Sequence, residues 1–288
     1  MFTKGLVLSN ILKAYINIVK SYQIDIQNIQ DGNNRMNSMG EGLEAYIKDI
    51  FANTIDETDE SKKLEKISKT FSYTGNKTNP PDMMLWGSDA IEVKKIESSN
   101  TSLQLNSSHP KSKLLSTNSK INQTCRGCEE WEEKDLIYTI GYVKKRRLNS
   151  LWMVYGECYA ADEGTYTKVE DEITSSINAA LNLEINRDTN ELSGVKNVDP
   201  LNITYLRVRG MWIIENPSKV FRYLYEYDKD VKFQLIALMK SSKYDSFSNE
   251  DKVSLEANKD ITIQDVKIKN PNNPANLIDS KLLVFKVL

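Results

Sequence analysis

The sequence contains a single histidine, His109, among its 288 residues. A Ser-His-Asp or Cys-His catalytic system could use only that residue, and histidine-metal nucleases and zinc hydrolases need more than one. The sequence also lacks a G-x-S-x-G nucleophile elbow, a Walker A loop and a dinucleotide-binding glycine fingerprint. These absences direct attention to chemistry carried by carboxylates and lysines.

Cysteine is scarce, and long hydrophobic runs are missing. Three cysteines and no secretory signal fit a reducing cytosol, so we expect a cytoplasmic protein. The apolar stretch at residues 5–13 is too short for a signal and is interrupted by Asn10 and Lys13. No apolar run approaches the length of a membrane span, so we expect no membrane partner.

Cys125 and Cys128 form a C-x-x-C pair without obvious partners. A structural zinc site needs four ligands, and only Cys158 and His109 remain to supply the others. No thioredoxin-like setting supports a redox role. We interpret the pair as a turn with two partly buried thiols, and a zinc site is the alternative.

The chain also lacks an excess of positive charge. Its net charge is −2 and its pI about 5.7, so the chain as a whole is not a basic nucleic-acid binder. A local basic cleft can still supply phosphate contacts. Candidate basic clusters are Lys94 with Lys95, Lys111 with Lys113, residues 144–147, and Arg207 with Arg209. We interpret the run at 144–147 as a solvated hairpin turn.

Hydrophobic residues make up 40% and charged residues 27% of the chain, as in an ordinary globular protein. No repeat or low-complexity linker divides it, so we expect one domain over residues 1–288, with β-rich C-terminal additions. The expected helices are 5–22, one from near Met39 with Ser38 as its N-cap, 64–71, 166–183 and 216–227. The expected strands are 82–86, 90–96, 103–105, 136–143, 151–156, 203–214, 231–239, 261–268 and 282–287.

A hairpin at residues 82–96 is the centre of the functional argument. Gly87-Ser88-Asp89 is a turn signal between two apolar runs. The second run alternates, which places Glu92 and Lys94 on one face. Antiparallel pairing across the short turn can bring Asp82 beside Glu92.

Two carboxylates and an ammonium on one face of a hairpin suit a hard divalent cation with a water molecule beside it. Mg²⁺ takes oxygen ligands, usually one or two carboxylates plus substrate phosphate oxygens. Asp82 and Glu92 are therefore the candidate metal ligands, and Lys94 can orient or deprotonate the attacking water. A surface hairpin with merely solvated charges is the alternative, because such motifs also occur by chance.

An earlier helix offers a third carboxylate. Glu41 and Glu44 lie three residues apart and so are neighbours on the helix surface. Glu41 can complete a capping box. Glu44 either faces water or reaches the metal site as an extra catalytic carboxylate, directly or through water, and the spacing does not decide between the two.

Two segments have the composition of a DNA-contacting surface. The loop after residues 103–105 offers Asn106, Ser107, Ser108, Lys111 and Lys113, which are groups that hold phosphates and read base edges. A polar solvent loop is the alternative. In residues 203–214, Tyr205, Arg207 and Arg209 share one face, and flanking residues that look buried argue against a solvent-facing sheet edge.

With these residues laid out, the sequence resembles the NgoPII-type family of type II restriction endonucleases, which are PD-(D/E)xK nucleases. The motif stands here as Pro81-Asp82, nine residues, then Glu92-Val93-Lys94. The resemblance runs through residues 40–51, 64–73, 79–97, 105–114, 125–138 and 199–217. Residues 105–111 and 205–212 are its more distinctive stretches, and the residues after Tyr227 add little.

The resemblance implies an α/β fold with a mixed central sheet flanked by helices, and a catalytic core of about residues 36–215. It implies Mg²⁺-dependent cleavage of both strands of DNA at a short palindrome, in this family GGCC, with Asp82, Glu92 and Lys94 as the catalytic set. It also implies a homodimer, because a palindrome matches two-fold protein symmetry, and a cognate DNA methyltransferase that protects the host.

Three other functions stay open. The chain could be a junction-resolving or repair nuclease of the same superfamily, or a DNA-binding module that has lost activity. It could also be an unrelated globular protein with a chance motif, a hypothesis that the low pI supports.

Overall fold

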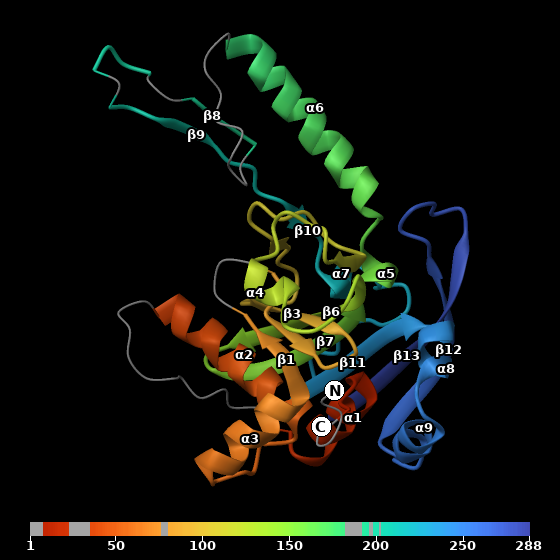
Figure 1. The fold of residues 1–288 in the computed structure, drawn as a ribbon. Helices are drawn as coiled ribbons and strands as arrows, with labels where there is room; N and C mark the ends of the chain where they lie inside the picture. The colour runs from red at the N-terminus through yellow and green to blue at the C-terminus, as the bar shows by residue number, and fades with distance from the viewer. Residues whose placement is uncertain (1–7, 23–34, 76–79, 182–191, 196–197, 202) are drawn as a thin grey trace.

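The structure, a computed structural model, describes residues 8–22, 35–75, 80–181, 192–195, 198–201 and 203–288 (Figure 1). It is an α/β fold built on one large mixed sheet, as expected. The strands of this sheet are β1 (Phe71–Thr74), β2 (Met83–Leu85), β3 (Ala90–Ile96), β5 (Lys113–Leu115), β6 (Glu133–Lys144), β7 (Arg147–Tyr155), β11 (Phe233–Lys240), β12 (Ile261–Lys269) and β13 (Leu277–Val287). Their order is β1-β2-β3-β6-β7-β11-β13-β12, and β5 pairs with β6.

The middle of the sheet combines parallel and antiparallel neighbours. β3 runs parallel to β6, and β7 runs parallel to β11, whereas β6 and β7 form an antiparallel hairpin. Its turn contains Lys145 and Arg146, both with positive φ, as expected for the basic turn. Nearly every residue of β7 and β11 is buried, because both of their faces are covered.

Helices and short ribbons surround this sheet. The helices are α1 (Ile11–Lys20), α2 (Arg35–Ala52), α3 (Glu60–Thr70), α4 (Gln123–Arg126), α5 (Gly156–Tyr159), α6 (Glu163–Leu181), α7 (Pro217–Val220), α8 (Ser241–Ser246) and α9 (Asn249–Glu256). Two small ribbons pair β4 (Leu103–Gln104) with β10 (Ile213–Ile214), and β8 (Ser193–Val195) with β9 (Leu206–Val208). No helix of the described ranges is both long and apolar enough to cross a membrane.

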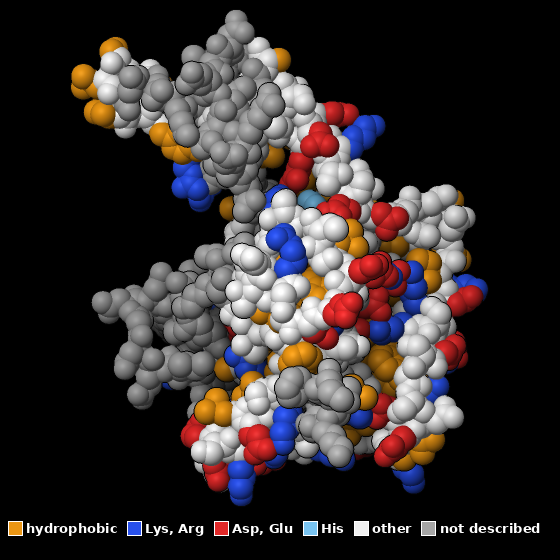
Figure 2. Space-filling model, in the orientation of Figure 1, with side chains coloured by type: hydrophobic (Ala, Val, Ile, Leu, Met, Phe, Trp, Pro, Cys, Tyr) orange, Lys and Arg blue, Asp and Glu red, His pale blue; other side chains and the backbone are white. Residues whose placement is uncertain are grey.

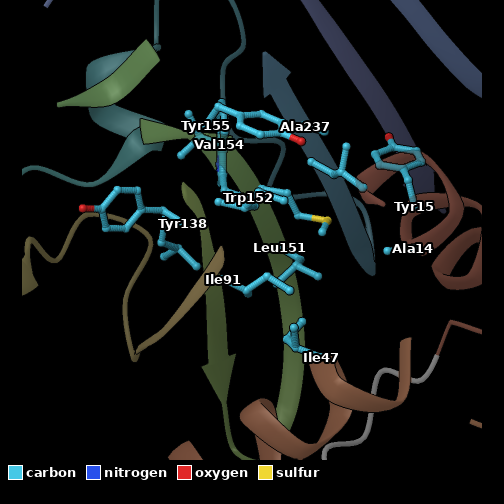
Figure 3. Close-up of a cluster of buried hydrophobic side chains, with 14 of the residues drawn as sticks. Ala14, Tyr15, Ile47, Ile91, Tyr138, Leu151, Trp152, Val154, Tyr155 and Ala237 are labelled. Atoms are coloured by element: carbon cyan, nitrogen blue, oxygen red, sulfur yellow. The ribbon is translucent and has the colours of Figure 1, made fainter. Parts of the chain in front are cut away.

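The core lies on both faces of the sheet (Figure 3). On one face, α2 packs closely on β6, where a Cβ at Gly141 would lie 2.7 Å from Leu43 Cδ2. On the other face, Tyr138 of β6 meets Tyr159 of α5 edge to face, with ring centroids 5.6 Å apart. Figure 3 shows the hydroxyl of Tyr138 directed away from the rest of the cluster.

Several expected boundaries are wrong. α1 begins at Ile11 with Asn10 as its N-cap, and residues 5–7 of the expected helix lie outside the described residues. α2 begins at Arg35, so position 38 is inside the helix and does not cap it, and the capping box with Glu41 is wrong as well. α7 is only four residues long, because the chain turns where buried Phe221 stacks against Trp152 at 6.0 Å.

The expected single strand over residues 203–214 is divided between two partners. Its first part, β9, pairs with β8, and its second part, β10, pairs with β4. Main-chain hydrogen bonds between Trp212 and residues 105 and 106 continue the second pairing. The flanking residues expected to be buried are not, since Leu206 is 50% exposed.

The C-terminal strands are part of the central sheet and extend it on one side. β11 pairs with β7 on one side and, over the whole length of β11, with β13 on the other, and β12 closes that side of the sheet. Tyr15 of α1 donates a 3.1 Å hydrogen bond to the carbonyl of Leu235 in β11. The first helix and the last strands therefore stabilise one another.

α6 and the β8–β9 ribbon project away from this body, and together we call them the arm (Figure 1). The apolar face expected for the helix is not buried, because Val169 is 43% and Ile173 42% exposed. Figure 2 shows hydrophobic side chains at the end of the arm, and Leu201 and Ile203 are among the most exposed apolar residues.

Candidate active site

The expected hairpin forms with the expected register. Met83 of β2 pairs with Ile91 of β3, and Met84 pairs with Ala90, so Asp82 comes next to Glu92. The turn places Gly87 at φ 59°, a conformation that favours glycine. The pairing brings a carboxylate from the start of β2 to the two charged residues of β3.

Two short contacts hold the three candidate catalytic residues on the hairpin. The Asp82 carboxylate accepts a 2.6 Å hydrogen bond from the main-chain N–H of Val93. Lys94 Nζ lies 2.6 Å from Glu92 Oε1. The strand thus holds one carboxylate by its backbone, and the lysine holds the other by charge.

Burial and mutual repulsion shape the electrostatics of this group. Burial of the carboxyl, followed by the nearby charge of Glu92, raises the pKa of Asp82 to about 8 against the opposing effects of Lys94 and the Val93 N–H. Burial alone would lower the pKa of Lys94, but Glu92 and Asp82 together raise it by a larger amount. The net change in its pKa is therefore upward. The Lys94 ammonium therefore stays charged, whereas the Asp82 carboxyl favours its protonated form.

Glu44 of α2 belongs to this electrostatic group. It raises the pKa of both Asp82 and Lys94, although it is the smallest of the contributions. Its side chain is half-buried. The structure thus brings Glu44 near the hairpin, a proximity that sequence spacing left undecided.

The donor set fits a hard divalent cation. Glu92 Oε2 is buried without a hydrogen-bond partner, which is costly for a carboxylate oxygen. Asp82 and Glu92 repel each other, and a cation between them would relieve both effects. No three His, Cys, Asp or Glu residues cluster as metal ligands within the described residues, so further oxygens would have to come from water or substrate.

Comparison with known proteins assigns this geometry to a family. The model of the family described as NgoPII restriction endonuclease matches residues 9–269. The chain belongs to the NgoPII restriction endonuclease family. It is 45% identical over 277 residues to the type II restriction enzyme NgoPII of Neisseria gonorrhoeae. The aligned region covers 96% of this chain and 99% of the relative. No solved structure matches the chain.

Membership makes the chain an endonuclease that cleaves DNA at specific sites. The match also extends well beyond Tyr227, where the sequence alone suggested little resemblance. Because the family model reaches residue 269, it includes β11 and all of β12. These two strands are therefore part of the restriction endonuclease family pattern.

The loop residues proposed to contact DNA have different surroundings in this endonuclease. Asn106 is exposed with φ 53°, and Ser107 is half-buried. The Ser108 hydroxyl is buried without a partner. Lys113 Nζ lies 2.7 Å from Glu133 Oε1 and 3.7 Å from Asp135 Oδ1, so its charge is already balanced.

Lys111 lies deeper than the sequence indicated. Only 5% of the residue is exposed, and its Nζ is buried without a hydrogen-bond partner. Arg207 and Arg209 are exposed and lie on or next to β9 in the arm, away from the β2–β3 hairpin (Figure 1). The candidate DNA contacts thus divide between the active site and the arm.

A polar and aromatic cluster attaches the arm to the body. His109 stacks on Tyr166 of α6 with ring centroids 5.3 Å apart, and Tyr166 meets Trp212 edge to face at 5.5 Å. Glu170 Oε1 accepts hydrogen bonds from Lys120 Nζ at 2.8 Å and from Trp212 Nε1 at 3.0 Å. Burial lowers the pKa of His109, which favours a neutral imidazole in a structural role.

The C-x-x-C pair is structural. The Cys125 thiol contacts Met84 Sδ at 3.3 Å, and Cys128 donates to the carbonyl of Cys125 at 3.1 Å. Burial raises the pKa of both thiols, to about 12 for Cys125. The two therefore form part of the packing behind β2, which agrees with the interpretation as a turn with partly buried thiols.

Sequence reasoning missed Tyr138 and Gly156. The Tyr138 hydroxyl accepts a 2.7 Å hydrogen bond from the Lys111 N–H and donates to the Lys111 carbonyl at 3.2 Å. A Cβ at Gly156 would lie 2.4 Å from the Ser112 carbonyl oxygen and 2.5 Å from that of Lys111. Both residues position Lys111, but only the folded structure brings these distant segments together.

Proposed function

We propose that this endonuclease cuts both strands of DNA at a short palindrome with Mg²⁺ as its cofactor, and that GGCC is the site. The observation that carries the proposal is the contact set of Asp82, Glu92 and Lys94 on the β2–β3 hairpin. The buried carboxyls of Asp82 and Glu92 and the charged lysine supply the groups that phosphodiester hydrolysis needs.

In this mechanism Asp82 and Glu92 hold the divalent cation. The bound cation supplies positive charge that offsets the charge developing on the phosphate. Lys94 donates hydrogen bonds that orient the attacking water. The water oxygen forms a bond to phosphorus and gives up a proton, one P–O ester bond breaks, and the departing deoxyribose oxygen takes up a proton in turn. Glu44, half-buried beside this group, acts through water.

The rest of the proposed interface brings the duplex to this site. Asn106, Ser107, Ser108 and Lys113 of the loop contact DNA near the hairpin, whereas Arg207 and Arg209 contact it from the arm. The arginines are suited to phosphates or to guanine edges, which GGCC provides.

The proposed enzyme works as a homodimer, because a palindrome requires two related active sites. Residues 1–288 form one restriction-endonuclease-like domain, with a catalytic core of about 36–215. A methyltransferase that modifies the same sequence protects the host, and both enzymes act on DNA in the cytoplasm.

The test is incubation of the purified protein with unmethylated phage DNA and Mg²⁺, sized on a gel beside an EDTA control. We expect discrete fragments that disappear with EDTA and whose ends map to GGCC. Discrete fragments with other ends would change the site but keep the enzyme class. No cleavage of plain duplex would overturn the proposal and favour a junction-specific nuclease or an inactive DNA-binding module.

A further inference from the structure

Lys111 differs from the other buried lysines near the hairpin. Lys134 is equally buried but has Glu129 Oε1 and the Ser88 carbonyl at 2.7 Å. Lys94 has Glu92 at 2.6 Å. Lys111 Nζ is buried and has no hydrogen-bond partner. Its ammonium is therefore the one of these three that lacks a close compensating group.

The fold brings Lys111 to the active site through its main chain. The Tyr138 hydroxyl forms hydrogen bonds with both the main-chain N–H and the carbonyl of Lys111. Tyr138 is also the partner of Glu92 in the parallel β3–β6 register, so the two side chains are neighbours on one face of the sheet. Gly156 has no side chain to push this segment away.

The charges around Lys111 also connect it to the catalytic hairpin. Burial lowers its pKa to about 8, while Glu163, Glu92 and Glu170 raise it and Lys120 lowers it. Glu92 belongs to the active site, and Glu163 and Glu170 belong to the base of the arm. Lys111 thus lies between these two parts of the molecule.

A buried cation without a partner is destabilising unless an anion reaches it. Glu92 Oε2 in β3 and Ser108 Oγ in the loop that carries Lys111 are also buried without hydrogen-bond partners. Buried polar groups of a native protein are normally satisfied, and a bound ligand is one way to satisfy them. The ligand that suits a lysine here carries oxygen atoms and negative charge, as a DNA phosphate does.

We propose that Lys111 is a second catalytic lysine, whose ammonium contacts a non-bridging oxygen of the phosphate that is cut. Lys94 is then left to orient the water, while Lys111 holds the phosphate and stabilises its added charge. This role rests on the proposed function and assigns to Lys111 more than the general DNA contact expected from its loop.

The test combines Lys111→Met with a change in the DNA. The cut position is first mapped with the wild-type enzyme, and that phosphate is then replaced by a neutral methylphosphonate. Binding of both duplexes is measured by fluorescence anisotropy with Ca²⁺ in place of Mg²⁺. We expect neutralisation to weaken wild-type binding about tenfold or more beyond its effect on Lys111→Met, where the cation still faces the same phosphate, since a hydrogen bond to a charged group is worth about that much.

Single-turnover cleavage gives an independent readout. We expect Lys111→Met to slow cleavage about 100-fold or more, whereas Lys267→Met, at an exposed pair with Asp279, should cut at the wild-type rate. Thermal unfolding should show Lys111→Met at least as stable as wild type, because an unpartnered charge is removed. Lys134→Met should unfold at a lower temperature, because buried Glu129 loses its ion-pair partner.

The outcomes separate the two proposals. Equal methylphosphonate effects on wild type and Lys111→Met, or unchanged cleavage by the variant, would overturn the role of Lys111 and leave the endonuclease assignment intact. If wild type cuts no duplex, the proposed function fails and the role of Lys111 fails with it. Lys111→Gln repeats the measurements if the methionine variant does not fold.

Discussion

The Asp82 carboxylate is held by the backbone of Val93, through a 2.6 Å hydrogen bond from its N–H. Val93 stands between Glu92 and Lys94 in β3. Because the donor is a main-chain group, no side-chain substitution at the two neighbouring positions removes it. Variants of Glu92 and Lys94 can therefore test chemistry without releasing Asp82 from the strand.

Lys94→Met should abolish most cleavage while preserving the fold. The substitution keeps the length of the side chain and removes the ammonium that we propose orients water, so we expect single-turnover cleavage to fall about 10²–10⁴-fold. Lys95→Met is the matched control, because the next residue on β3 points to the opposite face and pairs with Glu97 at 2.9 Å. Equal activity losses in the two variants would contradict the assignment of Lys94.

Asp82→Asn should stabilise the metal-free protein more at high pH than at low pH. The pKa of Asp82 is raised to about 8, whereas an unfolded aspartate titrates near 4. Between these values the folded protein holds a proton that the unfolded chain has released, so this group makes stability fall as pH rises. Asparagine stays neutral and removes that dependence.

Urea unfolding in EDTA at pH 5 and pH 8.5 measures this effect. We expect the gain in unfolding free energy from Asp82→Asn to be larger at pH 8.5, while cleavage is lost at either pH. Asp279→Asn, at an exposed aspartate of β13, should show no such difference. An Asp82→Asn gain that is the same at both pH values would show that the carboxyl is not protonated in the folded state.

The hairpin could be predicted from sequence because its information is local. Alternation on β3, the glycine turn and the charged positions lie within fifteen consecutive residues, and the observed register follows from them. The sheet order could not be predicted in the same way. β7 pairs with β11 across a long stretch of chain, and such pairings are set by tertiary packing.

The burial of Lys111 and the division of residues 203–214 could not be predicted for the same reason. Both depend on segments that are distant in the sequence and adjacent in the fold. Lys111 looks like a solvated loop lysine until Tyr138 and Gly156 are placed beside it. Residues 203–214 look like one strand until β8 pairs with Leu206–Val208 and β4 pairs with Ile213–Ile214. The residue types indicated the chemistry of the site, but the burial of each residue depended on segments far apart in the chain.

Gly156→Ala should displace the segment that carries Lys111. The added Cβ would lie 2.4 Å from one carbonyl oxygen and 2.5 Å from another, and backbone atoms cannot move aside as a flexible side chain can. We expect a loss of stability of about 1–3 kcal/mol, as for other overpacked sites, together with slower cleavage.

Gly164→Ala is the control for Gly156→Ala, because a Cβ there would meet nothing within 4 Å and the residue lies in α6. An alanine in a helix should be neutral or stabilising by up to about 1 kcal/mol. Urea unfolding and single-turnover cleavage check both variants. Wild-type stability and activity in Gly156→Ala would show that the segment can shift without consequence.

Arg207→Ala and Arg209→Ala should each weaken DNA binding through lost phosphate or guanine contacts from the arm. A lost phosphate contact reduces the slope of log binding constant against log salt by about one and affects all sequences alike. A lost guanine contact instead costs about 1–3 kcal/mol for GGCC alone and relaxes specificity. Binding measured against salt on GGCC and on a scrambled duplex therefore distinguishes the two roles for each arginine.

Arg222→Ala provides the baseline for both arginine variants, because Arg222 is exposed and pairs only at the surface with Glu226, at 2.7 Å. Such a pair contributes little to stability. Arg222→Ala tests whether the loss of any single positive charge lowers DNA affinity through the electrostatic field of the whole protein. If Arg222→Ala weakens binding as much as the arm variants do, the arm makes no specific contact and the duplex must be held by the loop and hairpin alone.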